Sequence, residues 1–149
     1  MKTLTTGDIA PNFILLDHNG KTFSLKDHRG QKLIVYFYPK NDSAVCTTEA
    51  CAFRDAFIEF QDLGVKVIGI NAGSVDEHHA FAKKNRLPFT LLSDPGNAVL
   101  RSFGIKPFLF LTGRETFVID EDGKIAYTFR AFLNGAAHPQ KVLDYLAKV

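Results

Sequence analysis

The chain has 149 residues, of which 46% are hydrophobic and 23% are charged, with a net charge of +2. This length predicts a single domain over residues 1–149 with enough apolar side chains for a substantial core. The basic residues are scattered rather than gathered in a stripe, so no nucleic-acid partner is indicated. No uncharged run approaches the ~20 residues that cross a bilayer, and the first residues lack the apolar segment of a secretion signal. We therefore expect a cytoplasmic protein with no membrane partner.

Metal and cofactor chemistry is not indicated by the side chains that could support it. Cys46 and Cys51 are the only cysteines, too few for a disulfide framework or a four-thiolate zinc site. The five histidines show no metal-ligand spacing, and His78 and His79 are neighbours that would point to different sides of a helix. We expect neither a metal nor a bound cofactor.

Strand and helix patterns alternate from the start of the chain. Two short apolar runs flank His18-Asn19-Gly20, which predicts a hairpin turn. A longer apolar run follows, then an amphipathic pattern that stops at Gly64, a residue suited to the end of a helix. The expected elements of this half are strands Phe13–Leu16, Phe23–Leu25, Lys32–Tyr38 and Val65–Asn71, with a helix over Thr47–Leu63.

The second half of the chain contains clear signals for helix starts and turns. Ser74-x-x-Glu77 is a capping box, Glu121-Asp-Gly123-Lys is a hairpin signal, and Pro139 suits the first position of a helix. Pro88 argues that the strand beside it is an edge strand. The expected elements are helices Ser74–Asn85, Asn97–Phe103 and Pro139–Val149 and strands Leu87–Leu92, Thr116–Asp120 and Ile125–Arg130.

This order predicts an α/β fold of the thioredoxin-like type. A strand, a helix and a second buried strand are followed by a hairpin and a final helix, which is the element order of that fold. We expect a central mixed β-sheet flanked by helices.

Cys46 lies in the first turn of the helix that follows the first central strand. Pro39 ends that strand, and Ser43 opens the helical pattern. The unpaired N–H groups of a helix start stabilise negative charge and favour the thiolate form of a cysteine. We therefore predict that Cys46 is a reactive thiolate.

The two cysteines cannot meet on an intact helix. At about 100° per residue, Ala50, Phe53, Phe57 and Phe60 lie on the face of Cys46, whereas Cys51 lies about 140° away. The two Cα atoms would be about 8.6 Å apart, beyond the ~7 Å that a disulfide spans. A bond between them would require the first turns to unwind.

These motifs resemble a known family. The pattern Pro39-x-x-x-Ser43-x-x-Cys46 resembles the active-site signature of peroxiredoxins. Cys51, with Glu49 before it, is similar to the peroxiredoxin Q, or bacterioferritin comigratory protein, branch. Arg114-Glu-Thr-Phe-Val-Ile-Asp resembles the second active-site segment of the family, and Gly7-Asp-Ile-Ala-Pro-Asn-Phe resembles its usual start.

The resemblance implies a thiol-dependent peroxidase that acts on hydrogen peroxide and organic hydroperoxides. Cys46 would attack the peroxide and become a sulfenic acid, and Cys51 would then form an intramolecular disulfide with it. Thioredoxin or a similar dithiol protein would reduce that disulfide. The resemblance also implies that the first hairpin is an N-terminal extension of the fold and that a segment is inserted between Ser74 and Lys106. We expect a monomer, with a dimer as the alternative.

The resemblance assigns roles to four further residues. Arg114 would stabilise the Cys46 thiolate and the charge that develops on the peroxide, and Glu49 would orient Arg114. Ser43 would exchange hydrogen bonds with the peroxide or the thiolate. Pro39 would shield the thiolate and shape the loop.

The chain departs from the branch in one loop, where Ser43-Ala44-Val45 replaces the usual Thr-Pro-Gly. Serine keeps the hydroxyl, but the loss of proline and glycine changes the stiffness of the loop. The apolar segment Lys106–Leu111 is interpreted as core, with a dimer contact or a wall for bulky hydroperoxides as alternatives.

Two other functions remain open on the sequence. A dithiol–disulfide oxidoreductase would usually carry a Cys-x-x-Cys motif, which the chain lacks. A redox-sensing or chaperone-like binding protein could use the same two cysteines only to switch conformation.

Overall fold

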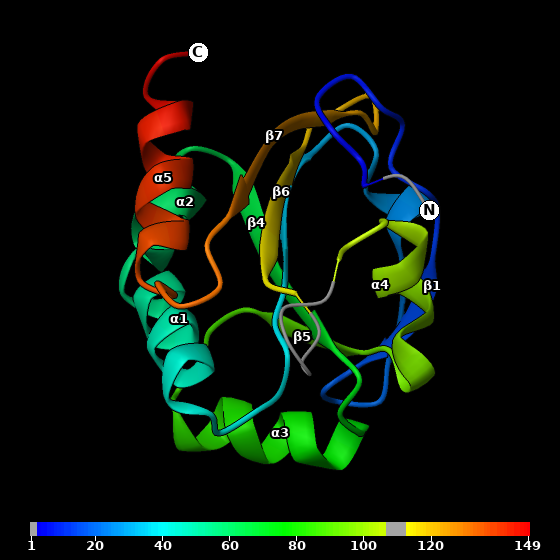
Figure 1. The fold of residues 1–149 in the computed structure, drawn as a ribbon, viewed down its shortest axis with the longest axis vertical. Coiled ribbons are helices and arrows are strands. Elements are labelled where there is room, and N and C mark those ends of the chain that lie inside the picture. Colours follow the sequence, from blue (N-terminus) through cyan, green and yellow to red (C-terminus); the bar gives the residue numbers. More distant parts are fainter. Residues whose placement is uncertain (1–2, 107–112) are drawn as a thin grey trace.

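The computed structural model describes residues 3–106 and 113–149, and these form a mixed sheet covered by helices on both faces (Figure 1). The seven strands lie in the order β2-β1-β5-β4-β3-β6-β7. At its centre, β3 (Lys32–Phe37) pairs in parallel with β4 (Val65–Asn71) and antiparallel with β6 (Glu115–Ile119). The two strands predicted on either side of the cysteine helix, β3 and β4, are therefore neighbours at the centre of the sheet.

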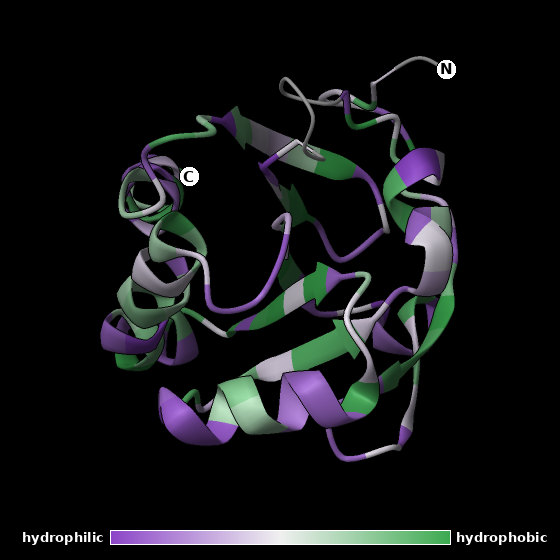
Figure 2. Cartoon of the chain, turned by 60° about the horizontal axis from the view of Figure 1, so that its bottom comes forward, coloured by the Kyte–Doolittle hydropathy of each residue, from purple (hydrophilic) through white to green (hydrophobic). Residues whose placement is uncertain are grey.

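Both faces of β3 are buried, which explains its unbroken apolar sequence. Ile34 and Tyr36 point to one core and Leu33 and Val35 to the other, because side chains alternate along a strand. The first core packs under α1 (Ala44–Asp55), α2 (Phe57–Asp62), α3 (Val75–Lys84) and α5 (Ala137–Leu146). The second core packs against α4 (Ala98–Ser102) and the N-terminal hairpin. Figure 2 shows the strands as largely hydrophobic and α3 as alternately hydrophilic and hydrophobic.

The remaining elements complete the predicted order. They are the hairpin strands β1 (Ile14–Asp17) and β2 (Thr22–Ser24), β5 (Thr90–Ser93), β7 (Ile125–Arg130), and the 3₁₀ turns at Leu25–His28 and Pro95–Asn97. The capping box of α3 is present, with Ser74 Oγ accepting from the Glu77 N–H and Glu77 Oε1 accepting from the Ser74 N–H. Within the described residues, no helix has the length and apolar character needed to cross a membrane.

The expected single helix over Thr47–Leu63 is wrong, because the chain bends at Ala56. The backbone of Ala56 leaves the helical region (φ −93°, ψ 2°), and its N–H is shared between the carbonyls of Ala52 and Arg54. This bend separates α1 from α2, which packs on β4. Gly64 follows with a positive φ of 72°, as predicted for the end of this helical segment.

Two further expectations fail for reasons of tertiary structure. The strand predicted over Leu87–Leu92 begins only at Thr90 and lies between β1 and β4, not at an edge. Pro88 precedes this strand, so it removes no N–H donor from the hydrogen bonds of the sheet.

Pro139 is the third residue of α5 and not the first, because the helix starts at Ala137. It still lies in the first turn, where the helix needs no N–H donor. The apolar segment Lys106–Leu111 lies, apart from Lys106, outside the described residues.

Phe53 anchors α1 to the sheet, and its truncation tests that packing. Its side chain is 0% exposed, and its ring stacks on Tyr36 with centroids 4.5 Å apart. We expect Phe53→Ala to lower the free energy of unfolding by about 3–5 kcal/mol, since both apolar burial and ring contacts are lost. Urea unfolding measures the loss. The control is Ile58→Ala on α2, where the side chain is 64% exposed and the change should stay within about 0.5 kcal/mol. Equal losses in the two variants would contradict the core position of Phe53.

Candidate active site

Cys46 lies in the first turn of α1, and its thiol is almost completely buried, with 1% of its surface exposed. Ser43 is the N-cap residue of this helix, and its hydroxyl oxygen accepts a hydrogen bond from the Cys46 N–H at 3.2 Å. The hydroxyl thereby satisfies one of the N–H groups that a helix start leaves unpaired. The predicted position of the thiol at a helix start is confirmed.

Arg114 is the side chain that contacts the thiol. Its Nη2 donates to Cys46 Sγ at 3.0 Å, its Nη1 donates to Glu49 Oε1, and its Nε donates to the Phe132 carbonyl at 2.8 Å. The guanidinium also lies 5.5 Å from the centroid of the Phe132 ring. Only 2% of Arg114 is exposed. With all three nitrogens engaged, the guanidinium is held in one orientation toward the sulfur.

The sheet explains how residues so distant in sequence meet. In the antiparallel pair of β3 and β6, Phe37 at the end of one strand lies opposite Glu115 at the start of the other. Arg114 therefore enters the sheet where the chain leaves β3 toward Ser43 and α1. Glu49 lies one turn after Cys46 on α1, so its carboxylate reaches the same guanidinium.

Cys51 lies apart from Cys46, in a different environment on α1. Both thiols are free, and Cys51 is half-buried with its Sγ 3.8 Å from Asn85 Oδ1. Arg54 donates to the Asn85 carbonyl at 2.8 Å and pairs with Asp55, so it belongs to this outer cluster rather than to the Cys46 site. The structure is thus that of a reduced form in which the two sulfurs have separate partners.

Comparison with known proteins now decides the family. The chain matches the AhpC/TSA family over residues 6–128. It is 42% identical to the protein named "Peroxiredoxin Q, chloroplastic" of Triticum aestivum, over 98% of this chain and 66% of that protein. It is also 42% identical to the protein of that name from Sedum lineare, over 98% of this chain and 77% of that protein. This chain belongs to the AhpC/TSA family, in its peroxiredoxin Q branch.

Solved structures of the branch share the fold. The crystal structure of peroxidoxin BcpB from Mycobacterium tuberculosis has a TM-score of 0.90 and 33% identity, with 98% of each chain covered. Peroxiredoxin Q of Xanthomonas campestris has a TM-score of 0.84 and 31% identity, over 91% of this chain and 90% of that one. The predicted thioredoxin-like fold and the predicted family are confirmed. The chain spans about two thirds of the length of several curated relatives, 66% in the case of the wheat protein.

Burial governs the charges around this peroxiredoxin thiol. Burial raises the pKa of Glu49 to about 8, although the charge of Arg114 and its hydrogen bond to Oε1 act in the opposite direction. Burial would lower the pKa of Arg114, but Glu49 and Cys46 more than offset this and raise it, so the guanidinium stays charged. Tyr36 on β3 and Tyr38, in the loop just after it, have pKa values raised mainly by burial and remain neutral near pH 7.

Two polar residues of the site were missed by the sequence reasoning. His138 is 0% exposed, with its Nδ1 3.4 Å from Glu49 Oε2 and 2.7 Å from Thr116 Oγ1. His138 comes from the start of α5 and Thr116 from β6. No local spacing links these residues to the cysteine motif. The packing of α5 against α1 brings His138 to the site, and the pairing of β6 with β3 brings Thr116 there.

The loop between β3 and α1 has its own anchors, also unpredicted. Tyr38 donates its hydroxyl to Asn41 Oδ1 at 2.8 Å, and Asn41 Nδ2 lies 2.9 Å from His78 Nδ1. His78 is buried, while its neighbour His79 is exposed, so the two rings do point to different sides of α3. Pro39 lies in the same loop and is half-buried. Its predicted shielding of the thiolate stays a prediction.

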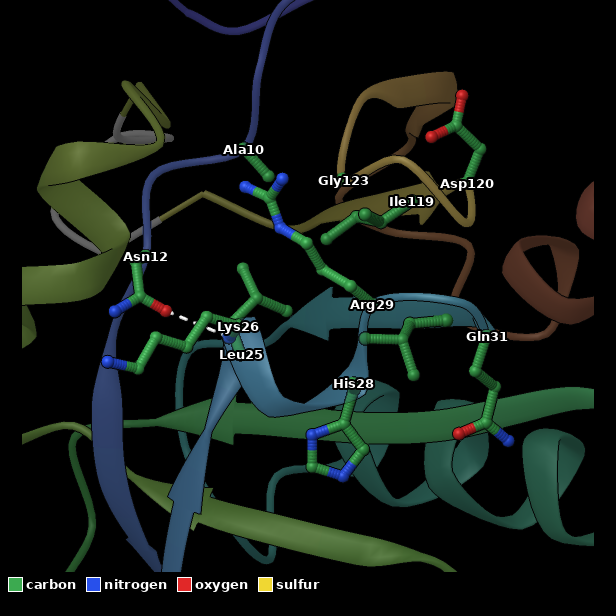
Figure 3. Close-up of a pocket in the computed structure, with 11 residues that line it drawn as sticks. Ala10, Asn12, Leu25, Lys26, His28, Arg29, Gln31, Ile119, Asp120 and Gly123 are labelled. Carbon is green, nitrogen blue, oxygen red and sulfur yellow. Dashed lines mark hydrogen bonds between the residues drawn. The ribbon is translucent and has the colours of Figure 1, made fainter.

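Figure 3 shows a small cavity of the structure. It is lined by Leu33 near the start of β3, by Ile119 at the end of β6, and by Lys26, His28 and Arg29. Its volume is about 20 Å³, close to the ~10–15 Å³ that one water requires. Cys46 and Arg114 lie beyond the other ends of these strands, so this cavity is separate from the candidate active site. In the described residues, no group of three or more His, Cys, Asp and Glu side chains could hold a metal ion.

The contact between Arg114 and Cys46 can be tested through thiol reactivity. Arg114→Ala alone would leave Glu49 Oε1 buried without its hydrogen-bond donor, which typically costs about 1–3 kcal/mol. We therefore compare Glu49→Gln with the double variant Glu49→Gln/Arg114→Ala, both with Cys51→Ser so that one thiol reacts. Loss of the adjacent positive charge should move the alkylation profile of Cys46 to higher pH by about 1–3 units. Superimposable profiles would mean that the guanidinium does not stabilise the thiolate in solution.

Proposed function

We propose that this chain is a thiol-dependent peroxidase that reduces hydrogen peroxide and organic hydroperoxides. The observation that carries the proposal is the 3.0 Å contact between Arg114 Nη2 and the buried sulfur of Cys46 at the start of a helix. A guanidinium and helix N–H groups in a site with little water stabilise both the attacking thiolate and negative charge on a departing oxygen.

The proposed reaction begins with attack of the Cys46 thiolate on one peroxide oxygen. The S–O bond forms as the O–O bond breaks, and Cys46 becomes a sulfenic acid. The other oxygen leaves as hydroxide or alkoxide and takes up one proton to give water or an alcohol. Arg114 stabilises the charge on both oxygens, and Glu49 holds Arg114 in place. Ser43 accepts a hydrogen bond from the peroxide or donates one to the thiolate, and Pro39 shields the thiolate and shapes the loop.

Cys51 is the proposed resolving thiol. Its thiolate attacks the sulfur of the sulfenic acid, a disulfide forms, and the sulfenic oxygen leaves as water after protonation. The ideal helix separation of about 8.6 Å between the Cα atoms and the contact of Cys51 with Asn85 require this segment of α1 to rearrange first. Thioredoxin or a similar dithiol protein then reduces the disulfide by thiol–disulfide exchange.

A redox-switching protein is the second candidate, because it would use the same two thiols. The geometry favours the enzyme, since a switch needs no buried guanidinium aimed at the reactive sulfur. A dithiol–disulfide oxidoreductase fits less well, because the two thiols lie in separate environments. Repeated turnover with a dithiol reductant supports the peroxidase, whereas a single stoichiometric oxidation supports the switch.

Cys46→Ser tests the proposal directly. A serine hydroxyl is not ionised near neutral pH, so we expect peroxide turnover with thioredoxin and its reductase to disappear. Cys51→Ser is the matched control, because it should still consume one equivalent of peroxide and then stop at the sulfenic acid. Substantial turnover by Cys46→Ser would refute the assignment of the nucleophile.

Disulfide formation should melt the start of α1. Amide exchange between Ser43 and Ala52 should accelerate after one equivalent of peroxide, because the disulfide cannot span the intact helix. The residues of α2 should stay protected, since Phe60 is buried in the core. The same treatment of Cys51→Ser should leave this pattern near that of the reduced protein. Equal exchange of reduced and oxidised wild-type protein would show that the disulfide does not form or needs no unwinding.

A further inference from the structure

We propose that His138 is a positioning residue of this site, because its Nδ1, 3.4 Å from Glu49 Oε2, is the acceptor that favours a proton on this otherwise unpartnered oxygen. That proton keeps Glu49 from cancelling the charge that Arg114 presents to Cys46. The inference deepens the proposed function, because it concerns the same thiol, and it assigns His138 no contact with the substrate.

The hydrogen bonds of His138 define its protonation. Its Nε2 lies 2.9 Å from the carbonyl oxygen of Ala131, which can only accept, so Nε2 carries a hydrogen. Burial lowers the pKa of His138 to about 4, and the positive charge of Arg114 acts in the same direction. The ring is therefore neutral near pH 7, and Nδ1 is an acceptor. Thr116 Oγ1, 2.7 Å away, can donate to it.

Glu49 faces this acceptor with an oxygen that has no hydrogen bond within the described part of the chain. Oε1 accepts from Arg114, whereas Oε2 is buried and lies 3.4 Å from His138 Nδ1. An ionised Oε2 would meet the electron-rich Nδ1 away from water, which is unfavourable, whereas a protonated Oε2 is a donor directed at it. Nδ1 has a single lone pair, so this donor competes for it with the Thr116 hydroxyl at 2.7 Å. Because burial raises the pKa of Glu49 to about 8, the protonated acid is well populated near pH 7.

The packing of α5 on α1 holds the two groups at this distance. A Cβ added at Gly135 would lie 2.8 Å from the Glu49 Cβ and 2.6 Å from the Val45 carbonyl oxygen, so the chain before α5 passes as close to α1 as glycine allows. The Phe129 ring, with its centroid 4.8 Å from that of His138, closes another side. The imidazole therefore has little freedom to turn away.

The proton on Glu49 Oε2 changes the net charge that Cys46 meets. An ionised Glu49 would neutralise Arg114, whereas the protonated acid leaves the guanidinium charge to the thiolate. Among the described residues, the other titratable groups around Glu49 are the neutral Tyr36 on β3, the neutral Tyr38 in the loop after it, and Cys46 on α1. The proton on Glu49 is thus the variable charge of this cluster near neutral pH.

Two substitutions at one position separate this role from a purely structural one. His138→Gln can keep a donor to the Ala131 carbonyl but loses the acceptor at Nδ1. His138→Asn can keep an acceptor near Nδ1 but loses the bond to Ala131. Both variants are made with Cys51→Ser. The readouts are the titration of the Glu49 side chain, followed by carbon-13 NMR, and the pH profile of Cys46 alkylation.

In His138→Gln we expect the pKa of Glu49 to fall from about 8 by a unit or more. The alkylation profile of Cys46 should move up by about one pH unit, which slows alkylation near pH 7 by up to ~10-fold. His138→Asn should stay close to the parent protein in both readouts. His79→Gln, which removes an exposed imidazole on α3, should change neither. Parent-like titrations in His138→Gln, or larger shifts in His138→Asn than in His138→Gln, would overturn the proposal.

If neither His138 variant folds, Thr116→Val is used to test the same proposal. It removes the hydroxyl that competes for Nδ1, so the pKa of Glu49 should rise and the alkylation profile should move to lower pH. An unchanged or lowered Glu49 pKa would count against the role of Nδ1 as its acceptor. Peroxide turnover of the wild-type protein is measured separately. If the wild-type protein shows no turnover, the peroxidase proposal is refuted, and the titration results remain valid. If turnover is normal but His138→Gln titrates like the parent protein, only the role of His138 is refuted.

Discussion

One buried guanidinium organises the functional end of this molecule. Arg114 joins the thiol of Cys46, the carboxyl group of Glu49 and the carbonyl of Phe132, which come from α1 and from the chain after β7. A buried positive charge is costly unless it is paired and hydrogen-bonded. The arginine therefore requires these partners to be in place, and their positions in turn require β6 to lie beside β3 and α5 to pack on α1.

The contacts of α3 give the reduced form a second constraint. Asn41 and Asp42 in the loop before α1 contact His78 and Lys84, and Cys51 contacts Asn85 at the end of α3. The segment that carries both cysteines is thus tied to α3 at both ends. The proposed disulfide must break the contact at Cys51, while the Phe53 and Phe60 rings keep the rest of α1 and α2 on the sheet. We therefore expect the start of α1 to rearrange when the disulfide forms, while the rest of the fold stays in place.

The candidate site was predicted well where it depends on short-range pattern. Ser43, Cys46 and Glu49 lie within two turns of one helix, so the helical period alone places them near one another. Their pairing with Arg114 came from the family resemblance, and the antiparallel register of β3 and β6 supplies its physical reason. His138 and Thr116 escaped prediction, because a lone histidine and a strand threonine carry no pattern that identifies a partner. The catalytic roles of all these residues remain predictions.

By itself, the sequence determined the order of the elements, the buried character of β3 and β4, and the position of Ser43 at the opening of the helix that carries Cys46. These are local consequences of apolar runs, caps and turn residues. Only the tertiary structure decided that β5 is an inner strand, that the cysteine helix bends at Ala56, and that Glu49 Oε2 meets His138. Each of these depends on which surfaces pack together. Packing of that kind joins residues far apart in the chain, and no local pattern records it.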